Sequence, residues 1–278
     1  MARKIFTLLI CLLVLWVFLE LNNAWIKTTK YTIKSKEIPK AFDGLNIVQI
    51  SDLQDATFGE KQEKLMRKIR KAEPDLVVIT GDLVDSNRYD LANSLDLMKQ
   101  LVKITDVFFV LGNHEVAVNK VDEITEALSA LGVHVLRNQA IHLKKDHEFI
   151  SIMGVDDPLM KGKQSPDKAM EQMIQAALSS VPQERFTILL SHRPELIDVY
   201  AENEVNLVFS GHAHGGQIRL PGFGGLIAPG QGWFPRYTSG EHQEKKTTMI
   251  ISRGLGNSLF PYRIFNRPEI IAVTLKTS

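Results

Sequence analysis

Short runs of β-branched and aromatic residues recur along the chain from Leu45 onward, each followed by a polar loop and then by a longer amphipathic stretch. Near-continuous apolar runs of this length are typical of strands that are buried on both faces of a sheet. The predicted strands are Tyr31–Lys36, Ile47–Ile50, Leu76–Thr80, Val107–Leu111, Phe149–Val155, Thr187–Ser191, Leu207–Ser210, Thr248–Ser252 and Ile270–Leu275.

Between these strands, apolar residues recur at helical spacing, and Pro74 and the Gly81-Asp82 turn mark boundaries. Strands that alternate with helices indicate an α/β fold with largely parallel sheet and helices outside it. The stretch from Gly211 to Gly232 contains eight glycines and little helical period. Loops of that length inside a compact domain are usually functional. The predicted helices are Lys61–Ala72, Leu91–Val102, 121–131, 167–180 and 194–203.

The N-terminal segment Ile5–Leu19 is apolar apart from Thr7, and Arg3 and Lys4 stand just before it. A helix over this segment is slightly short of the roughly 30 Å hydrocarbon core of a bilayer. A signal peptide is the competing interpretation, but Asn22–Trp25 offers a poor small-residue cleavage site. A buried core helix is the third, and the missing polar face counts against it. We therefore predict an uncleaved transmembrane helix.

The predicted organisation is a membrane anchor over 1–22, a polar connection over 23–43 and one catalytic domain over 44–278. A short basic N-terminal tail before a long soluble region is typical of a signal anchor, which predicts a single-pass protein with an extracytoplasmic domain. Lys27, Lys30, Lys34 and Lys36 follow the apolar segment closely, however, and basic residues favour the cytoplasmic side.

Composition narrows the chemistry. Hydrophobic residues make up 44% and charged residues 23% of the chain, which is ordinary for a globular protein, and the formal net charge of +1 argues against a nucleic-acid partner. Cys11, the only cysteine, lies in the apolar segment. The rest of the chain therefore forms no disulfide, thiolate zinc site or cysteine nucleophile. Any metal must use oxygen and imidazole ligands.

Five of the predicted strands end in a cluster of polar residues. In open α/β sheets the carboxyl ends of strands converge on one crevice, so these clusters should meet there. Taken singly, an Asp after a strand is more often a turn former or a helix cap. Five clusters at the same relative position instead indicate one site. The clusters are Ser51–Gln54, Gly81–Asp85, Gly112–Glu115, His192 and Gly211–His214.

The order and residue types of these clusters resemble the calcineurin-like metallophosphoesterase superfamily, whose pattern is D-x-H, G-D-x-x-D, G-N-H-D/E, a later H and G-H-x-H. The resemblance implies a β-sandwich flanked by helices, with a dinuclear metal centre at its top edge. It implies that Asp82 bridges both metals. The other implied ligands are Asp52 and His214 for one metal, and Asn113, His192 and His212 for the other.

Gln54 departs from the pattern, because the family usually has histidine there. A glutamine carbonyl oxygen binds hard cations but is a weaker ligand than imidazole for Zn or Fe. The outcomes are a first site that selects Mn, a readily lost first metal, or a metal-deficient pseudoenzyme, and Asp55 could supply a carboxylate by another route. We expect a working centre with two divalent cations, Mn rather than Fe or Zn.

In such a centre, two cations about 3.5–4 Å apart bind phosphoryl oxygens and activate a bridging hydroxide, which attacks phosphorus. No enzyme nucleophile is needed, in agreement with the missing cysteine. The resemblance implies that His114 donates a proton to the leaving group or stabilises charge, and that Asp85 orients it as a positioned general acid. The alternative for Asp85 is a cap of the following helix.

The C-terminal third resembles the bacterial, membrane-associated branch of the superfamily, which includes a phosphodiesterase acting on UDP-2,3-diacylglucosamine. The motifs are Gly211–Gln217, Ala228–Gly230, Ser252–Gly256 and Asn266–Glu269. Arg253 could clamp phosphate through its guanidinium fork or form a structural salt bridge. Trp233–Pro235 could wall a lipid or sugar groove or dip into the bilayer surface.

The expected function is therefore a phosphodiesterase that cleaves a lipid-linked or nucleotide-linked phosphate ester at the membrane. A phosphomonoesterase or protein phosphatase is the alternative within the same chemistry. From a different class, a catalytically silent membrane-bound binding protein would follow if Gln54 marks loss of the first metal. About two equivalents of bound metal per chain would favour an enzyme. A chain without bound metal would favour the binding protein.

Overall fold

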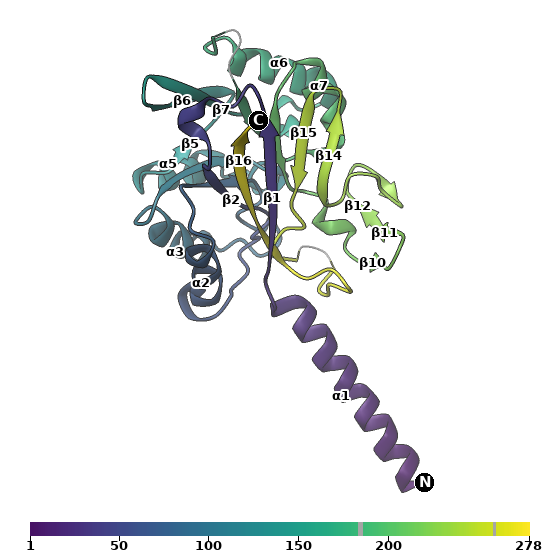
Figure 1. The fold of residues 1–278 in the computed structure, drawn as a ribbon. Helices are drawn as coiled ribbons and strands as arrows, with labels where there is room; N and C mark the ends of the chain where they lie inside the picture. Colours follow the sequence, from purple (N-terminus) through teal and green to yellow (C-terminus); the bar gives the residue numbers. More distant parts are fainter. Residues whose placement is uncertain (183–185, 258–259) are drawn as a thin grey trace.

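The computed structural model describes residues 1–182, 186–257 and 260–278 and consists of two facing six-stranded sheets with helices on their outer faces (Figure 1). One long helix, α1 (Ala2–Ala24), projects away from this sandwich. The predicted α/β sandwich flanked by helices, preceded by an apolar N-terminal helix, is confirmed.

The first sheet has the order β1-β16-β2-β3-β4-β5. The strands β2 to β5 run parallel, and β16 joins β2 antiparallel while pairing parallel with β1. The two ends of the domain therefore meet in adjacent strands. Its strands are β1 (Lys27–Ser35), β2 (Asn46–Ile50), β3 (Leu76–Thr80), β4 (Asp106–Val110), β5 (His134–Val135) and β16 (Glu269–Thr277).

The second sheet has the order β14-β15-β9-β8-β7-β6. Its four central strands are parallel, and the strands at both edges are antiparallel to their neighbours. Its strands are β6 (Gln139–Lys145), β7 (Glu148–Gly154), β8 (Thr187–Leu190), β9 (Leu207–Ser210), β14 (Gly240–Glu244) and β15 (Thr247–Ile251).

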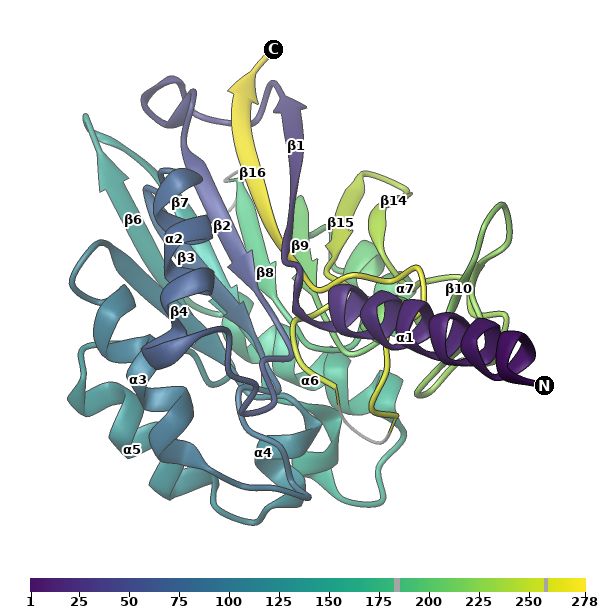
Figure 2. The same cartoon turned by 90° about the horizontal axis from the view of Figure 1, so that it is seen from below.

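Helices cover both outer faces, and four short strands form two hairpins within the glycine-rich segment (Figures 1 and 2). The α-helices of the domain are α2 (Glu63–Lys71), α3 (Leu91–Leu101), α4 (Asn113–Ala117), α5 (Val121–Ala130), α6 (Pro166–Leu178) and α7 (Ile197–Glu202). The hairpin strands are β10 (Arg219–Leu220), β11 (Gly224–Gly225), β12 (Ile227–Ala228) and β13 (Gly232–Trp233). Short 3₁₀ turns lie at Lys40–Phe42, Glu60–Gln62, Pro158–Lys161, Pro194–Leu196 and His214–Gly216.

Alternate residues of each strand pack into different layers. Phe108 and Phe209 meet in the layer between the sheets, while Val77 faces the helices on the first sheet and Leu189 those on the second. Burial of each such side chain is worth roughly 1.5–3 kcal/mol. This packing fixes the strands from both sides, so the loops at their carboxyl ends project from a rigid base.

The N-terminal region differs from the predicted organisation. The helix α1 continues past the predicted anchor boundary to Ala24. The predicted connection 23–43 contains β1, which begins at Lys27 rather than Tyr31 and pairs with β16 along its whole length. Because Ile33 is buried against the sandwich, this strand belongs to the folded domain.

Candidate metal centre

The loops that follow β2, β3, β4, β8 and β9 meet in one place, although they come from two different sheets. The first sheet contributes the side chains of Asp52, Gln54, Asp82, Asn113 and His114, and the second contributes His192, His212 and His214. All of the histidines and carboxylates among them are buried. The predicted gathering of five separate clusters is therefore what the structure contains.

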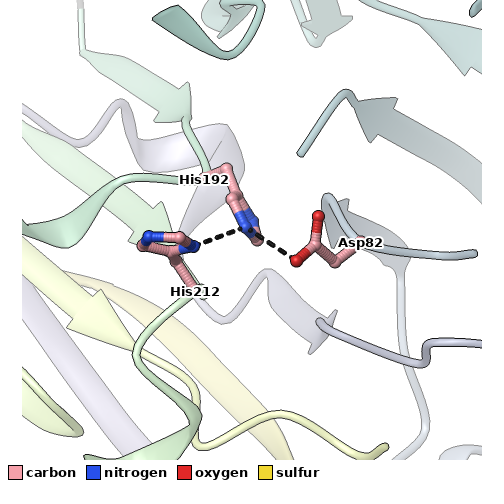
Figure 3. Close-up of side chains that lie close together, drawn as sticks. All are labelled: Asp82, His192 and His212. Carbon is pink, nitrogen blue, oxygen red and sulfur yellow. Dashed lines mark hydrogen bonds and ion pairs between the residues drawn. The ribbon is translucent and has the colours of Figure 1, made fainter. Parts of the chain in front are cut away.

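The first group of candidate ligand atoms consists of His192 Nε2 and three atoms close to it. Its Nε2 atom lies 3.2 Å from Asp82 Oδ2, 3.1 Å from Asn113 Oδ1 and 3.1 Å from His212 Nδ1. Figure 3 shows His192 between Asp82 and His212. Ligand atoms around a tetrahedral metal with bonds of about 2.0–2.1 Å are separated by roughly 3.3 Å. The three distances from His192 Nε2 are close to that separation, and ligand atoms of Asp82, His192 and His212 all lie within 4.8 Å of one another, as a site for a small divalent cation requires.

A second group shares Asp82 with the first. The carboxylates of Asp52 and Asp82 and an imidazole nitrogen of His214 lie within 4.8 Å of one another, with His214 Nε2 3.4 Å from Asp52 Oδ1. Gln54 Nε2 lies 3.2 Å from the same His214 nitrogen. A carboxylate common to both groups, flanked by imidazoles, is a donor set suited to two divalent metals.

The second group contains buried polar atoms that lack hydrogen bonds. In the described part of the chain, Gln54 Oε1 and His214 Nδ1 have no partner. The oxygen and nitrogen of a glutamine amide exchange places by a simple rotation of the amide group. In the rotated state the oxygen of Gln54 would point at His214 Nε2, where a cation could bind it.

The charges of the candidate ligands balance locally. Burial alone would lower the pKa of His192, but the adjacent Asp82 carboxylate raises it to about 10. Burial would raise the pKa of Asp82, but His192 holds it below its usual range. Burial and the charge of His192 lower the pKa of His212, and burial lowers that of His214. A cation would replace the proton that Asp82 and His192 hold between them.

Several of the predicted ligands have an unusual backbone conformation. Five of the predicted ligands have positive φ angles, a conformation that non-glycine residues rarely adopt and that costs about 1–3 kcal/mol each. Such conformations persist where the surroundings over-determine them, and they cluster at functional sites. The angles are 50° at Asp52, 48° at Gln54, 51° at Asp82, 66° at His212 and 46° at His214.

His114 faces the centre without belonging to either metal group. Its Nδ1 accepts a hydrogen bond from the Ser86 N–H at 2.9 Å, and its Nε2 lies 3.9 Å from Asp82 Oδ2. Because Nδ1 is an acceptor, the neutral ring carries its proton on Nε2. Nε2 is therefore the ring nitrogen that faces the shared carboxylate.

Asp85 contacts this ring less directly than predicted. Its carboxylate lies 3.7 Å from His114 Nδ1 and accepts hydrogen bonds from the Asn87 N–H and from the Arg88 guanidinium. Burial would raise the pKa of Asp85, but these donors lower it. Asp85 therefore fixes the turn that presents Ser86 to His114, and it caps no helix, because α3 is capped by Asp90.

Arg253 lies in an ion pair. Its Nη2 is 2.7 Å from Glu269 Oε2, and both side chains are mostly buried. Among the described residues that line the hollow over the metal centre, Arg253 is absent. Of the two predicted roles, the structural salt bridge is the one that these contacts support.

Sequence reasoning assigned no role to two buried groups beside the ligands. Glu115 accepts hydrogen bonds from the backbone N–H groups of Asp82, Val84 and Gly112, and burial raises its pKa to about 7. It fastens the loops after β3 and β4 together. Glu115 is the last residue of the Gly112–Glu115 cluster, so its position in the sequence could have indicated a role at the site.

The second such group is Arg193. It is bound to Asp157 and donates to His212 Nε2 at 2.8 Å, and Glu195 lies 4.0 Å from the same nitrogen. If His212 binds a metal through Nδ1, its Nε2 carries the proton, and the Glu195 carboxylate rather than the guanidinium is the group that can accept it. The position of Arg193 next to His192 was the only signal in the sequence.

Comparisons with known proteins agree with this geometry. The sequence model of the calcineurin-like phosphoesterase family matches residues 45–216, and the chain belongs to that family. It is 36% identical to the metallophosphoesterase YkuE of Bacillus subtilis, over 91% of this chain and 86% of that protein. It is 28% identical to a Danio rerio protein named "transmembrane protein with metallophosphoesterase domain", over 90% of this chain and 57% of that protein.

The fold is also similar to a solved structure, the protein TT1561 of Thermus thermophilus, with a TM-score of 0.54, 11% identity and coverage of 76% of this chain and 90% of that one. The family and the buried ligand groups together identify a phosphoric ester hydrolase that depends on metal. The apolar α1 and the name of the Danio rerio relative also suggest association with a membrane.

Proposed function

We propose that this chain is a phosphodiesterase that uses two divalent cations to hydrolyse a lipid-linked or nucleotide-linked phosphate ester at a membrane surface. The observation that carries the proposal is a hollow of about 650 Å³ that joins the candidate ligands to an apolar wall. Its lining residues include Asp82, Asn113, His114, His212 and His214 on one side, and Ile227, Ala228, Pro229 and Phe260 on the other.

Exposed aromatic side chains lie close in sequence to the residues of the apolar wall. Phe223 is 81% exposed, and Trp233 and Phe234 are each 67% exposed, on the hairpins formed by β10–β13. In both overall views α1 leaves the domain toward the side that carries these hairpins (Figures 1 and 2). Phe265 contacts Phe18 of α1 edge-on, with 5.3 Å between the ring centres. An amphiphilic ester could reach the ligands along this route.

We assign Asp82 as the ligand shared by both cations. Asp52, His214 and the Gln54 oxygen would hold one, and Asn113, His192 and His212 the other. Bound cations would supply Lewis acidity toward phosphoryl oxygens and acidify a water molecule. An amide oxygen in place of imidazole favours Mn over Fe or Zn in the first position.

The protein's own proton donor is His114. Its Nε2–H would hydrogen-bond to the leaving oxygen of the ester and release its proton to it as the bond to phosphorus breaks. Ser86 holds Nδ1 and so keeps the ring in the donor tautomer, and Asp85 holds the turn that carries Ser86.

The localisation that we propose is a single crossing by α1, with the domain outside the cytoplasm. The exposed side chains of α1 from Ile5 to Val17 are apolar apart from Thr7 and Cys11, as a lipid-facing helix requires. In sealed membrane vesicles of known orientation, protease should reach the domain from the extracytoplasmic side. Digestion from the cytoplasmic side would place the domain where the basic residues after α1 favour it.

The assay compares bis(p-nitrophenyl) phosphate with p-nitrophenyl phosphate, using full-length protein loaded with Mn. Faster turnover of the diester is the expected result, together with about two equivalents of metal per chain. Preference for the monoester would make the chain a phosphomonoesterase or a protein phosphatase. Absence of both metal and turnover would make it a membrane-bound binding protein.

A second arm tests the lipid link. A diacylated nucleotide sugar such as UDP-2,3-diacylglucosamine is compared with its deacylated counterpart in the same detergent. The acylated substrate should have the lower KM, because its chains can occupy the apolar wall at Ile227 and Phe260. Equal KM values would remove the lipid from the proposal and leave the diesterase assignment intact.

A further inference from the structure

Basic side chains gather at the base of α1, away from the metal centre. Lys64, Arg67, Lys68 and Lys71 lie three or four residues apart on α2, which places them on one face of that helix. The opposite face is apolar and buried in the core. Figure 1 shows α2 near the point where α1 joins the domain.

This basic face forms one wall of two adjoining hollows. The first, of about 380 Å³, lies between these four side chains and Ala24 to Ile26, the last residue of α1 and the two that follow it. The second, of about 290 Å³, lies between Lys68 and Lys71 on one side and Lys27, Lys30 and Arg267 on the other. Binding sites for small ligands begin at about 300 Å³. We call the two hollows together the basic collar.

The charge of the basic collar is not neutralised within the protein. Among the described residues, no acidic side chain lines either hollow and none of its lysines or arginines takes part in an ion pair. The whole chain carries a net charge of only +1, so this local excess is a feature of one surface. Such a concentration of cations attracts an anionic partner.

The place of the basic collar decides what that partner is. Trp25, at the end of α1, is 55% exposed, and the Arg267 guanidinium stacks over its ring at 4.2 Å. Tryptophan and arginine at the end of a membrane-spanning helix lie at the level of the lipid headgroups. Basic clusters directly beside such a helix bind anionic lipids.

We propose that the basic collar binds the headgroups of anionic phospholipids in the adjacent leaflet and so fixes how the domain lies on the membrane. The proposal rests on the membrane insertion of α1 proposed above, but not on the assigned reaction. The aromatic hairpins lie on the side toward which α1 projects, so a domain held at its base by the collar would present the hollow over the metal centre to the bilayer.

The test uses full-length protein in detergent and native mass spectrometry, which counts the phospholipids that each chain retains. Dioleoyl-phosphatidylglycerol is the anionic probe and dioleoyl-phosphatidylcholine the neutral one. The variant replaces three exposed residues of the collar: Lys64→Gln, Arg67→Gln and Lys71→Gln. The matched control carries Lys144→Gln and Lys145→Gln at the exposed end of β6 and Lys245→Gln on the turn between β14 and β15, at the opposite end of the domain.

The wild type and the control should retain phosphatidylglycerol in preference to phosphatidylcholine, and the collar variant should lose at least about tenfold in that affinity. Equal retention of both lipids by the wild type, or equal losses in both variants, would overturn the proposal. Displacement by inorganic phosphate or by an oligonucleotide at the same concentration would also overturn it, because the site would then bind a soluble anion or nucleic acid.

Turnover of bis(p-nitrophenyl) phosphate, a soluble ester, is measured for each protein in parallel. Unchanged turnover in the collar variant shows that it is folded and separates the two proposals. A lipid preference without any turnover would contradict the proposed reaction but would still support lipid binding by the basic collar. If the triple variant loses turnover, the single change Arg67→Gln, at an exposed position, replaces it and should give a smaller loss in the same direction.

Discussion

The two halves of the metal centre are built differently. In the half formed by Asn113, His192 and His212, each candidate ligand atom lies 3.1–3.2 Å from its neighbour on His192. In the half formed by Asp52, Gln54 and His214 the spacing is 3.2–3.4 Å, and buried atoms lack partners within the described chain. Both halves share Asp82.

The outer contacts follow the same division. His212 has the Glu195 carboxylate 4.0 Å from its outer nitrogen, and His192 Nδ1 lies 2.7 Å from the Thr80 carbonyl. No partner within the described chain meets the outer nitrogen of His214. Because outer partners typically change metal affinity by about 10–100-fold, the half with His192 should bind its cation more tightly. We therefore expect one stronger and one weaker metal position around the Asp82 carboxylate.

The largest effect is expected from Asp82→Asn, because this change removes the carboxylate that both halves share. Metal should be lost from both positions, and turnover of bis(p-nitrophenyl) phosphate should fall by more than about a hundredfold. Elemental analysis after gel filtration measures the metal. Asp146→Asn, on the exposed turn between β6 and β7, is the control and should keep both.

Retention of one cation by Asp82→Asn would show that the half with His192 holds metal without the shared carboxylate. The two halves would then be independent sites. Loss of one cation in the control would mean that the protein, rather than the centre, had been damaged.

His114→Ala separates proton donation from metal binding. Both cations should stay bound, because the ring belongs to neither ligand group, while turnover should fall by about 10²–10⁴-fold. The loss should be smaller for a nitrophenyl leaving group, which needs little protonation, than for an alkyl one. His147→Ala, at an exposed turn, is the control. Loss of metal together with activity would assign His114 to the centre as a ligand.

Gln54→His sharpens the contrast between the halves directly. The substitution restores imidazole beside His214, and histidine tolerates the φ of 48° at this position better than most residues do. Affinity for the weaker cation should rise by about tenfold, with a shift of preference from Mn toward Zn. Metal retained after dialysis against a graded chelator measures both. Unchanged retention would mean that the weaker half does not use residue 54.

The sequence predicted what depends on local pattern. Runs such as Leu76–Thr80 became strands because they are buried on both faces, and the polar cluster after each run converged because strand ends meet. The edge strands β6 and β14 were missed because they are only partly buried and carry charged or polar residues, so no apolar run marks them. The pattern of apolar residues reveals strands that are buried, and edge strands are buried only in part.

Contacts between segments that are distant in the sequence could not be predicted either. Ser86 orients His114 through its backbone N–H, and a pattern of side chains in the sequence does not predict a backbone contact of this kind. The basic collar joins α2 to Arg267 across most of the chain, and the near-neutral net charge hid it. The two halves of the candidate metal centre likewise differ through Glu195, whose relation to His212 depends on how the second sheet packs.

The smallest effect on turnover is expected from Arg253→Ala. The ion pair with Glu269 is mostly buried, and Gly254, the next residue, packs against Asp52. Removing the guanidinium should cost about 3 kcal/mol of stability, because the buried Glu269 carboxylate then keeps only hydrogen bonds from the Thr29 hydroxyl and the backbone N–H of residue 253. The melting temperature of the metal-loaded protein should therefore fall, while KM for the diester stays within about twofold, since Arg253 does not line the hollow over the centre.

Glu269→Gln in the Arg253→Ala background is the matched test, because it removes the unpaired charge. Part of the lost stability should return, whereas a phosphate clamp would gain nothing from that second change. A rise of more than about tenfold in KM for Arg253→Ala, unrelieved by Glu269→Gln, would restore the clamp. If the loss is structural, the metal that dissociates first on heating should be the one beside Asp52, because Leu255 and Gly256 hold the Asp52 carbonyl through their N–H groups.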